Sequence, residues 1–136
     1  MDEIAIKIGG VLSAIVGIGH CFFYRGFGWN EDFKKTRLIT AKVLYTIHLF
    51  VIPMLFFLSY ASFFHTKELA GGTPLGIEMT AFCSIFWFFR GLWQIVYFRP
   101  SRIRGAGKLL PLHYSLIIFF IFLWSAYTFP ILSRFL

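Results

Sequence analysis

The sequence has few charged residues and very few acidic ones. Charged residues make up 14% of its 136 residues, and Asp and Glu together number only 6. A soluble domain carries about 25% charged residues. The carboxylates form no catalytic pair and no HExxH motif, and no Ser or Cys has an obvious base nearby. The sequence therefore favours a non-enzymatic role and leaves open only redox chemistry on a bound cofactor.

Cysteine is scarce as well. Cys21 and Cys83 form no CxxC motif and no spacing typical of metal ligands. They fall in different apolar runs, at membrane depths about 18 Å apart by the helical rise, which excludes a disulfide between them. The acidic start, Met-Asp-Glu, lacks the positive segment that a secretory signal needs, so we expect the first apolar run to be retained as a helix.

Apolar and aromatic residues are abundant instead. Hydrophobic residues make up 58% of the chain and aromatic residues 21%, with 19 Phe. Four apolar runs are each long enough to cross roughly 30 Å of hydrocarbon as a helix, over about 4–24, 31–64, 74–98 and 110–133. The segments between them are short, so consecutive helices should be antiparallel. The sequence predicts an all-α integral membrane protein: one membrane domain, 1–136, forming a four-helix antiparallel transmembrane bundle.

Local signals refine the expected helix ends. Asn30, followed by two acidic residues, is a good start for the second helix, and Thr73 followed by Pro74 is a good start for the third. Pro111 is similarly suited to the start of the fourth helix. Pro53 falls near the middle of the second run, where it removes one backbone hydrogen bond, so we expect a kink there.

The distribution of cations predicts the orientation in the membrane. The segments after the first and third runs carry nine Lys and Arg residues: Arg25, Lys34, Lys35, Arg37, Lys42, Arg99, Arg102, Arg104 and Lys108. The opposite side carries three: Lys7, Lys67 and Arg134. Positive charge marks the cytoplasmic side of short loops. We therefore expect an integral protein, in a bacterial inner membrane, with both termini outside and the loops 25–37 and 99–108 in the cytoplasm.

The net charge of +7 does not indicate nucleic-acid binding, because the cations lie in short segments between apolar runs and no soluble face presents them. The expected partner is the lipid bilayer, whose anionic headgroups attract basic loops at about 1 kcal/mol per cation. An alternative use of these loops is to dock an acidic partner or a phosphorylated ligand.

Arg90 is the most informative polar residue, since it lies inside the third run, about eight residues or roughly 12 Å from the cytoplasmic end. An Arg at a helix centre costs about 2.5–3.5 kcal/mol on insertion scales and usually faces the interior of a bundle. Gln94 lies one turn further on the same face. Arg90 either pairs with neighbouring carbonyls or lipid phosphates, or it grips the carboxylate or phosphate of a ligand.

Three histidines share this part of the membrane. His20, His48 and His113 come from the other three runs and lie in the cytoplasmic half or near the centre, and Tyr45 lies one turn from His48. Small residues Gly10, Ser13 and Gly17 share a face with His20, which favours its pointing into the bundle. The predicted ligand-binding residues are Arg90, Gln94, His48 and Tyr45. The predicted metal or haem ligands are His20, His113 and His48, and the cofactor that they suggest is haem b.

Three functions remain open at this stage. The first is a non-catalytic subunit or assembly component that packs against other membrane subunits or against copies of itself. The second is a membrane protein that binds haem, a quinone or a lipid in the polar pocket. The third is a small transporter, which ranks last because the outer half of the bundle offers only Glu78 as an ionisable group.

Overall fold

The computed structural model describes residues 1–102 and 105–136. Arg104, which we counted among the loop cations, lies outside the described residues. The chain is all-helical within these ranges, and its long helices are α1 (Asp2–Gly26), α3 (Leu38–Phe64), α5 (Pro74–Val96) and α6 (Leu110–Leu132). Each is long and apolar enough to cross a membrane. The predicted fold class, four long apolar helices packed against each other, is confirmed.

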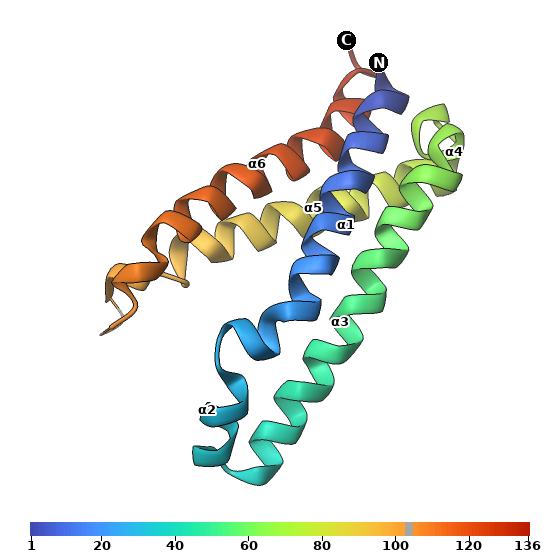
Figure 1. The fold of residues 1–136 in the computed structure, drawn as a ribbon. Helices are drawn as coiled ribbons and strands as arrows, with labels where there is room; N and C mark the ends of the chain where they lie inside the picture. Colours follow the sequence, from blue (N-terminus) through green and yellow to red (C-terminus); the bar gives the residue numbers. More distant parts are fainter. Residues whose placement is uncertain (103–104) are drawn as a thin grey trace.

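The long helices form two hairpins (Figure 1). In one hairpin α1 packs along α3, and in the other α5 packs along α6, while α1 also packs against α6 and so joins the two. The hairpins meet near the chain termini, which lie at one end of the molecule, and they diverge toward their other ends. Neighbouring spans in each hairpin are antiparallel, as the short connections required.

The second predicted helix, 31–64, is divided in the structure. A short helix α2 (Trp29–Lys35) precedes α3, and Thr36 and Arg37 between them are extended, with ψ angles of 151° and 132°. The Thr36 hydroxyl donates to the carbonyl of Asp32, a local bond that competes with helix continuation. The expectation that Asn30 caps this helix is wrong, because the cap position is Gly28, whose φ of 68° favours glycine.

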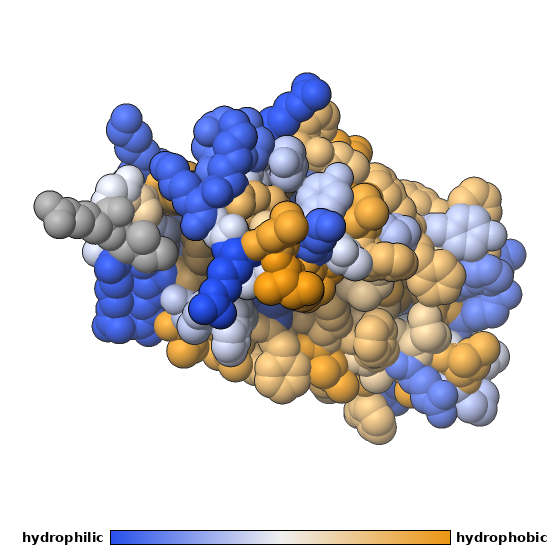
Figure 2. Space-filling view, turned by 90° about the horizontal axis from the view of Figure 1, so that it is seen from below, coloured by the Kyte–Doolittle hydropathy of each residue, from blue (hydrophilic) through white to orange (hydrophobic). Residues whose placement is uncertain are grey.

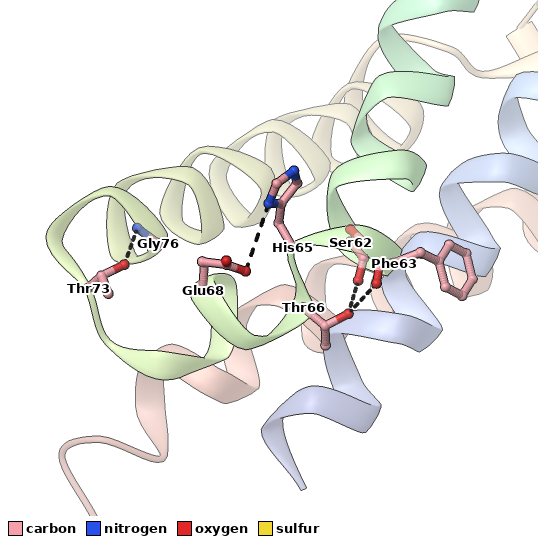
Figure 3. Close-up of polar contacts among 7 residues, drawn as sticks. All are labelled: Ser62, Phe63, His65, Thr66, Glu68, Thr73 and Gly76. Carbon is pink, nitrogen blue, oxygen red and sulfur yellow. Dashed lines mark hydrogen bonds and ion pairs between the residues drawn. The ribbon is translucent and has the colours of Figure 1, made fainter.

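The expected loop 65–73 also contains a helix, α4 (Thr66–Gly71). The predicted cap at Thr73 is confirmed, because its hydroxyl accepts a hydrogen bond from the Gly76 amide at 3.1 Å (Figure 3). A methyl group on Gly76 would overlap the carbonyl oxygen of Glu68, so this contact between α4 and α5 requires glycine. Nearby, Thr66 donates to the carbonyls of Ser62 and Phe63, which ties α4 to the end of α3.

Two short 3-10 helices, η1 (Pro100–Arg102) and η2 (Gly107–Leu109), flank the turn between α5 and α6. Pro111 stands in the first turn of α6, as predicted. Pro53 lies inside α3, which remains one helix from Leu38 to Phe64.

The packing of α1 depends on small residues. Gly9 lies against the ring of Tyr127 from α6, and Gly10 lies against Ser62 from α3. Ser13, Ser62 and Tyr127 are fully buried, and the Tyr127 hydroxyl lies 2.7 Å from Ser62 Oγ and 3.4 Å from Ser13 Oγ. Hydrogen bonds across helices supply attraction that apolar side chains alone do not provide in lipid.

Both ends of the chain take part in the fold. Ser133 donates to the Asp2 carboxylate at 2.9 Å, which joins the end of α6 to the start of α1. Arg134 donates to the carbonyls of Leu69 and Ala70, at 3.1 and 3.2 Å, and so satisfies the last carbonyls of α4. The end of the chain is therefore tied to α1 through Ser133 and to the connection between the hairpins through Arg134.

Most of the remaining surface is apolar. In the most apolar stretch of each candidate span, only 22–33% is buried inside the molecule. Figure 2 shows hydrophilic side chains gathered toward the two ends of the molecule on this face, with hydrophobic side chains over the region between them. This distribution matches a protein that presents its middle to the hydrocarbon of a bilayer and its ends to water.

Candidate functional site

Three predicted site residues form one hydrogen-bonded chain across α5 and α6. Arg90 Nη1 donates to Gln94 Oε1 at 3.0 Å, and Gln94 Nε2 lies 3.0 Å from His113 Nδ1. The 90–94 spacing puts the first two side chains on one face of α5, and the antiparallel packing of α6 brings in the third. Gln94 is 1% exposed and His113 7%. We call these three residues the Arg90 chain.

The charge of Arg90 is only partly compensated. Its guanidinium carbon lies 4.5 Å above the centre of the Phe120 ring, a cation–π contact. In residues 1–102 and 105–136 its side chain forms no ion pair with a carboxylate. Arg90 also borders a groove on the outer face of α5 with Phe82, Phe86 and Phe89. The cation therefore rests on a ring and an amide, both of them neutral.

The Arg90 chain lines a cavity of about 180 Å³ between the hairpins. Its other walls are aromatic or apolar, and they come from the α1–α2 turn and from the facing ends of α5 and α6: Phe23, Phe27, Trp29, Phe98, Leu109, Leu112 and Leu116. We call this space the inter-hairpin cavity. It combines one cation with two neutral polar groups in surroundings that are otherwise hydrophobic.

The other two histidines form a second group, on the first hairpin. His20 Nδ1 donates to the Val16 carbonyl at 2.8 Å, and His48 Nε2 donates to the His20 carbonyl at 2.9 Å. The two rings stack with centroids 5.6 Å apart, and Trp29 packs edge-on against His48 at 4.8 Å. His20, His48 and Trp29 border a second cavity, of about 480 Å³, which also includes Asp32. Trp29 thus lines both cavities.

The structure places Tyr45 away from both groups. Its ring packs edge-on against Tyr24 at 5.5 Å, and it lines a separate surface hollow with Lys42 and Phe33. The helical turn between Tyr45 and His48 puts them near each other along α3, but the hollows that they line are different.

The predicted metal and haem ligands divide between the two groups, with His20 beside His48 and His113 beside Gln94. No three His, Cys, Asp or Glu side chains among the described residues gather where they could hold a metal ion. His20 donates from Nδ1, which leaves Nε2 as the nitrogen for an iron. The Nδ1 of His113 faces the Gln94 amide, whose N–H groups can only donate, so the Nε2 of a neutral His113 carries the proton. Haem ligation by His113 would require Gln94 to turn over and lose Arg90.

No protein-family model matches the chain, and neither a curated protein nor a solved structure matches it. The geometry of the chain itself therefore carries the functional inference.

Several residues that shape the site could not be placed there from the sequence. Trp29 lines both cavities, and no sequence pattern indicated this position. Phe23 and Phe27 form a wall opposite the Arg90 chain. Gly26 and Gly28 flank Phe27 in the sequence, but their spacing does not show that this segment faces α5 and α6. Trp87 lies one turn before Arg90 on α5, and it has a buried Nε1 with no hydrogen-bond partner among the described residues.

Proposed function

We propose that this small polytopic membrane protein binds an anionic amphiphile, with the head group at Arg90 in the inter-hairpin cavity. The observation that carries this proposal is a cation in the third span that lines a largely apolar cavity and forms no ion pair within the described residues. An Arg at this depth costs about 2.5–3.5 kcal/mol on insertion scales. An oxyanion in the cavity would lower that cost directly.

The walls of the cavity fit the rest of such a molecule. Phe23, Phe98 and Leu112 offer aromatic and aliphatic surface beside the polar chain. The volume of about 180 Å³ is smaller than the roughly 300–1,000 Å³ of sites that enclose a drug-sized ligand. The cavity therefore suits a head group and the first carbons of its tail, with the remaining hydrocarbon extending into the bilayer.

Mass spectrometry of the gently purified protein tests this proposal. The wild type should retain a bound anionic lipid or fatty acid, and Arg90→Ala should lose it. Arg102→Ala is the matched control, because Arg102 is exposed beyond the end of α5 and does not line the cavity. If Arg90→Ala keeps its helical content and its bound molecule at the wild-type level, the proposal is wrong.

Haem binding by His20, His48 and His113 is a weaker candidate, since the tautomer of His113 opposes it. An absorption spectrum of the purified protein decides this point. A Soret band that His20→Ala removes would support haem, whereas a spectrum without it, together with no iron by elemental analysis, would rule haem out.

A role as a non-catalytic subunit is an alternative to ligand binding, and one observation favours it. Among the long helices, α3 packs extensively only against α1. Much of its first half is exposed, including Leu38, Ile39 and Phe50 at 71%, 69% and 69%. A defined oligomer or a co-purifying complex in detergent would support this role. A transport role has less support, because Phe120 lies midway between His113 and Tyr127 along α6 and stacks with Trp87, so apolar rings interrupt the polar residues.

A further inference from the structure

The hydrogen bonds of the Arg90 chain have only one possible direction. A guanidinium can only donate, so the group of Gln94 that faces Arg90 must be its oxygen. The amide nitrogen of Gln94 therefore faces His113, and it too can only donate. The Nδ1 of His113 must accept this bond. A permanent positive charge at one end of the chain thus sets the protonation of the imidazole at the other end.

The consequence for His113 is a fixed tautomer. Because Nδ1 is an acceptor, the imidazole is neutral and its single proton is on Nε2. The structure shows no partner for Nε2 among the described residues, and this atom is not one of their fully enclosed unpartnered atoms. His113 lines the inter-hairpin cavity, where Nε2 is left free to donate.

All polar groups that the chain leaves available are therefore donors. Arg90 has five N–H donors, of which the structure uses one within the chain. Each of the two acceptor atoms, Gln94 Oε1 and His113 Nδ1, already takes part in one bond within the chain, and the second lone pair of Oε1 belongs to a side chain that is only 1% exposed. A hydroxyl or ammonium head group would find no acceptor on this wall, and an ammonium would also meet the positive charge of Arg90.

We propose that Gln94 is a positioning residue, which leaves only hydrogen-bond donors of the Arg90 chain open to the cavity. We call this surface the donor-only wall. It selects a head group that carries two unprotonated oxygens on one atom. One oxygen pairs with Arg90, and the second accepts from His113 Nε2. This rests on the proposed function and adds the chemical class, a phosphate or carboxylate oxyanion, and the role of Gln94. No bond is made or broken; the selectivity comes from hydrogen-bond direction alone.

Gln94→Glu is the sharpest variant, because it preserves the shape of the side chain and reverses its hydrogen bonding. A glutamate would neutralise Arg90 and accept from His113 Nδ1, so the His113 proton would move from Nε2 to Nδ1. The wall would then carry no net positive charge and would present an acceptor in place of the His113 donor. We expect at least a tenfold loss of oxyanion affinity without loss of the fold.

The test joins nuclear magnetic resonance of ¹⁵N-histidine-labelled protein, in maltoside micelles at neutral pH, with binding of two probes, dodecyl phosphate and dodecanoate. A His113→Asn sample identifies the His113 resonances. Without any probe, His113 should show an unprotonated Nδ1 and a protonated Nε2 in the wild type, and the reverse in Gln94→Glu. At least one probe should bind the wild type and shift the ¹⁵N resonance of His113 Nε2. The same probe should bind Gln94→Glu at least tenfold more weakly. Dodecyltrimethylammonium, which carries no oxyanion, should not bind. The probe that binds more tightly identifies phosphate or carboxylate.

The outcomes separate the two proposals. If a probe binds in an Arg90-dependent way but His113 carries its proton on Nδ1, or Gln94→Glu binds equally well, the donor-only wall is wrong and the proposed function stands. If the tautomer is as expected but neither probe binds, the hydrogen-bond direction is right, and both the selectivity and the proposed function are wrong.

Discussion

The hydroxyl of Tyr127 donates to the hydroxyl of Ser62 at 2.7 Å, because Ser62 uses its own proton toward the Leu58 carbonyl. Both side chains are fully buried where α6 meets α3. Tyr127→Phe should therefore lower the free energy of unfolding by about 0.6 kcal/mol, with about 1.7 kcal/mol as the upper end for such bonds in membranes. Equilibrium unfolding in mixed micelles, with helicity as the signal, measures this loss. Tyr60→Phe is the control, since Tyr60 is 50% exposed, and an equal loss in both variants would contradict the interpretation.

Gly9 allows the Tyr127 ring to approach α1. A methyl group at position 9 would lie 2.7 Å from two atoms of that ring, closer than a real contact permits. Gly9→Ala should destabilise the protein by about 1–3 kcal/mol, as overpacking does in a tight interface. Gly26→Ala is the matched control within the same helix, because a methyl group there meets nothing within 4 Å. If Gly9→Ala unfolds no more easily than Gly26→Ala, α1 and α6 do not pack as the structure shows.

The two hairpin turns should face the same side of the membrane. In a background of Cys21→Ser and Cys83→Ser, we expect Lys34→Cys and Lys108→Cys to be labelled by an impermeant thiol reagent only from the cytoplasmic side. Lys67→Cys, at α4, should be labelled only from the outside. The expectation rests on the positive-inside rule, and the shared end of the two termini is compatible with it. Labelling of Lys34→Cys and Lys108→Cys from opposite sides would overturn the four-span topology.

Sequence patterns were sufficient to predict those structural features that depend on a single helix. Length and apolarity identified the four spans, and Thr73 and Pro111 identified two helix starts. The i, i+4 spacing of Arg90 and Gln94 put both side chains on one face, and the structure joins them by a hydrogen bond. Each of these features depends on residues within one helix, so the sequence of that helix determines it.

Other features depend on which face of each helix packs, and the sequence carries little of that information. Lipid is as apolar as Leu or Phe, so hydrophobic residues surround α6 on all sides and do not identify the face that meets α1. The contact of Gln94 with His113, and the burial of Tyr127, both depend on that rotation. The division between α2 and α3 was missed for a different reason, because a single local bond from Thr36 competes with an otherwise acceptable helix.

The hydrogen bonds from Arg134 to the α4 carbonyls have a consequence for the order of assembly. The donor follows its acceptors by 64 and 65 residues, so the contact cannot form until the second hairpin has been synthesised. During synthesis, α1 and α3 can enter the bilayer and pair while the carbonyls of Leu69 and Ala70 still bind water. Arg134 can then donate to these carbonyls and add a contact between the end of the second hairpin and α4. The connection between the hairpins therefore gains these two hydrogen bonds only after α6 has been synthesised, later than the contacts within the first hairpin.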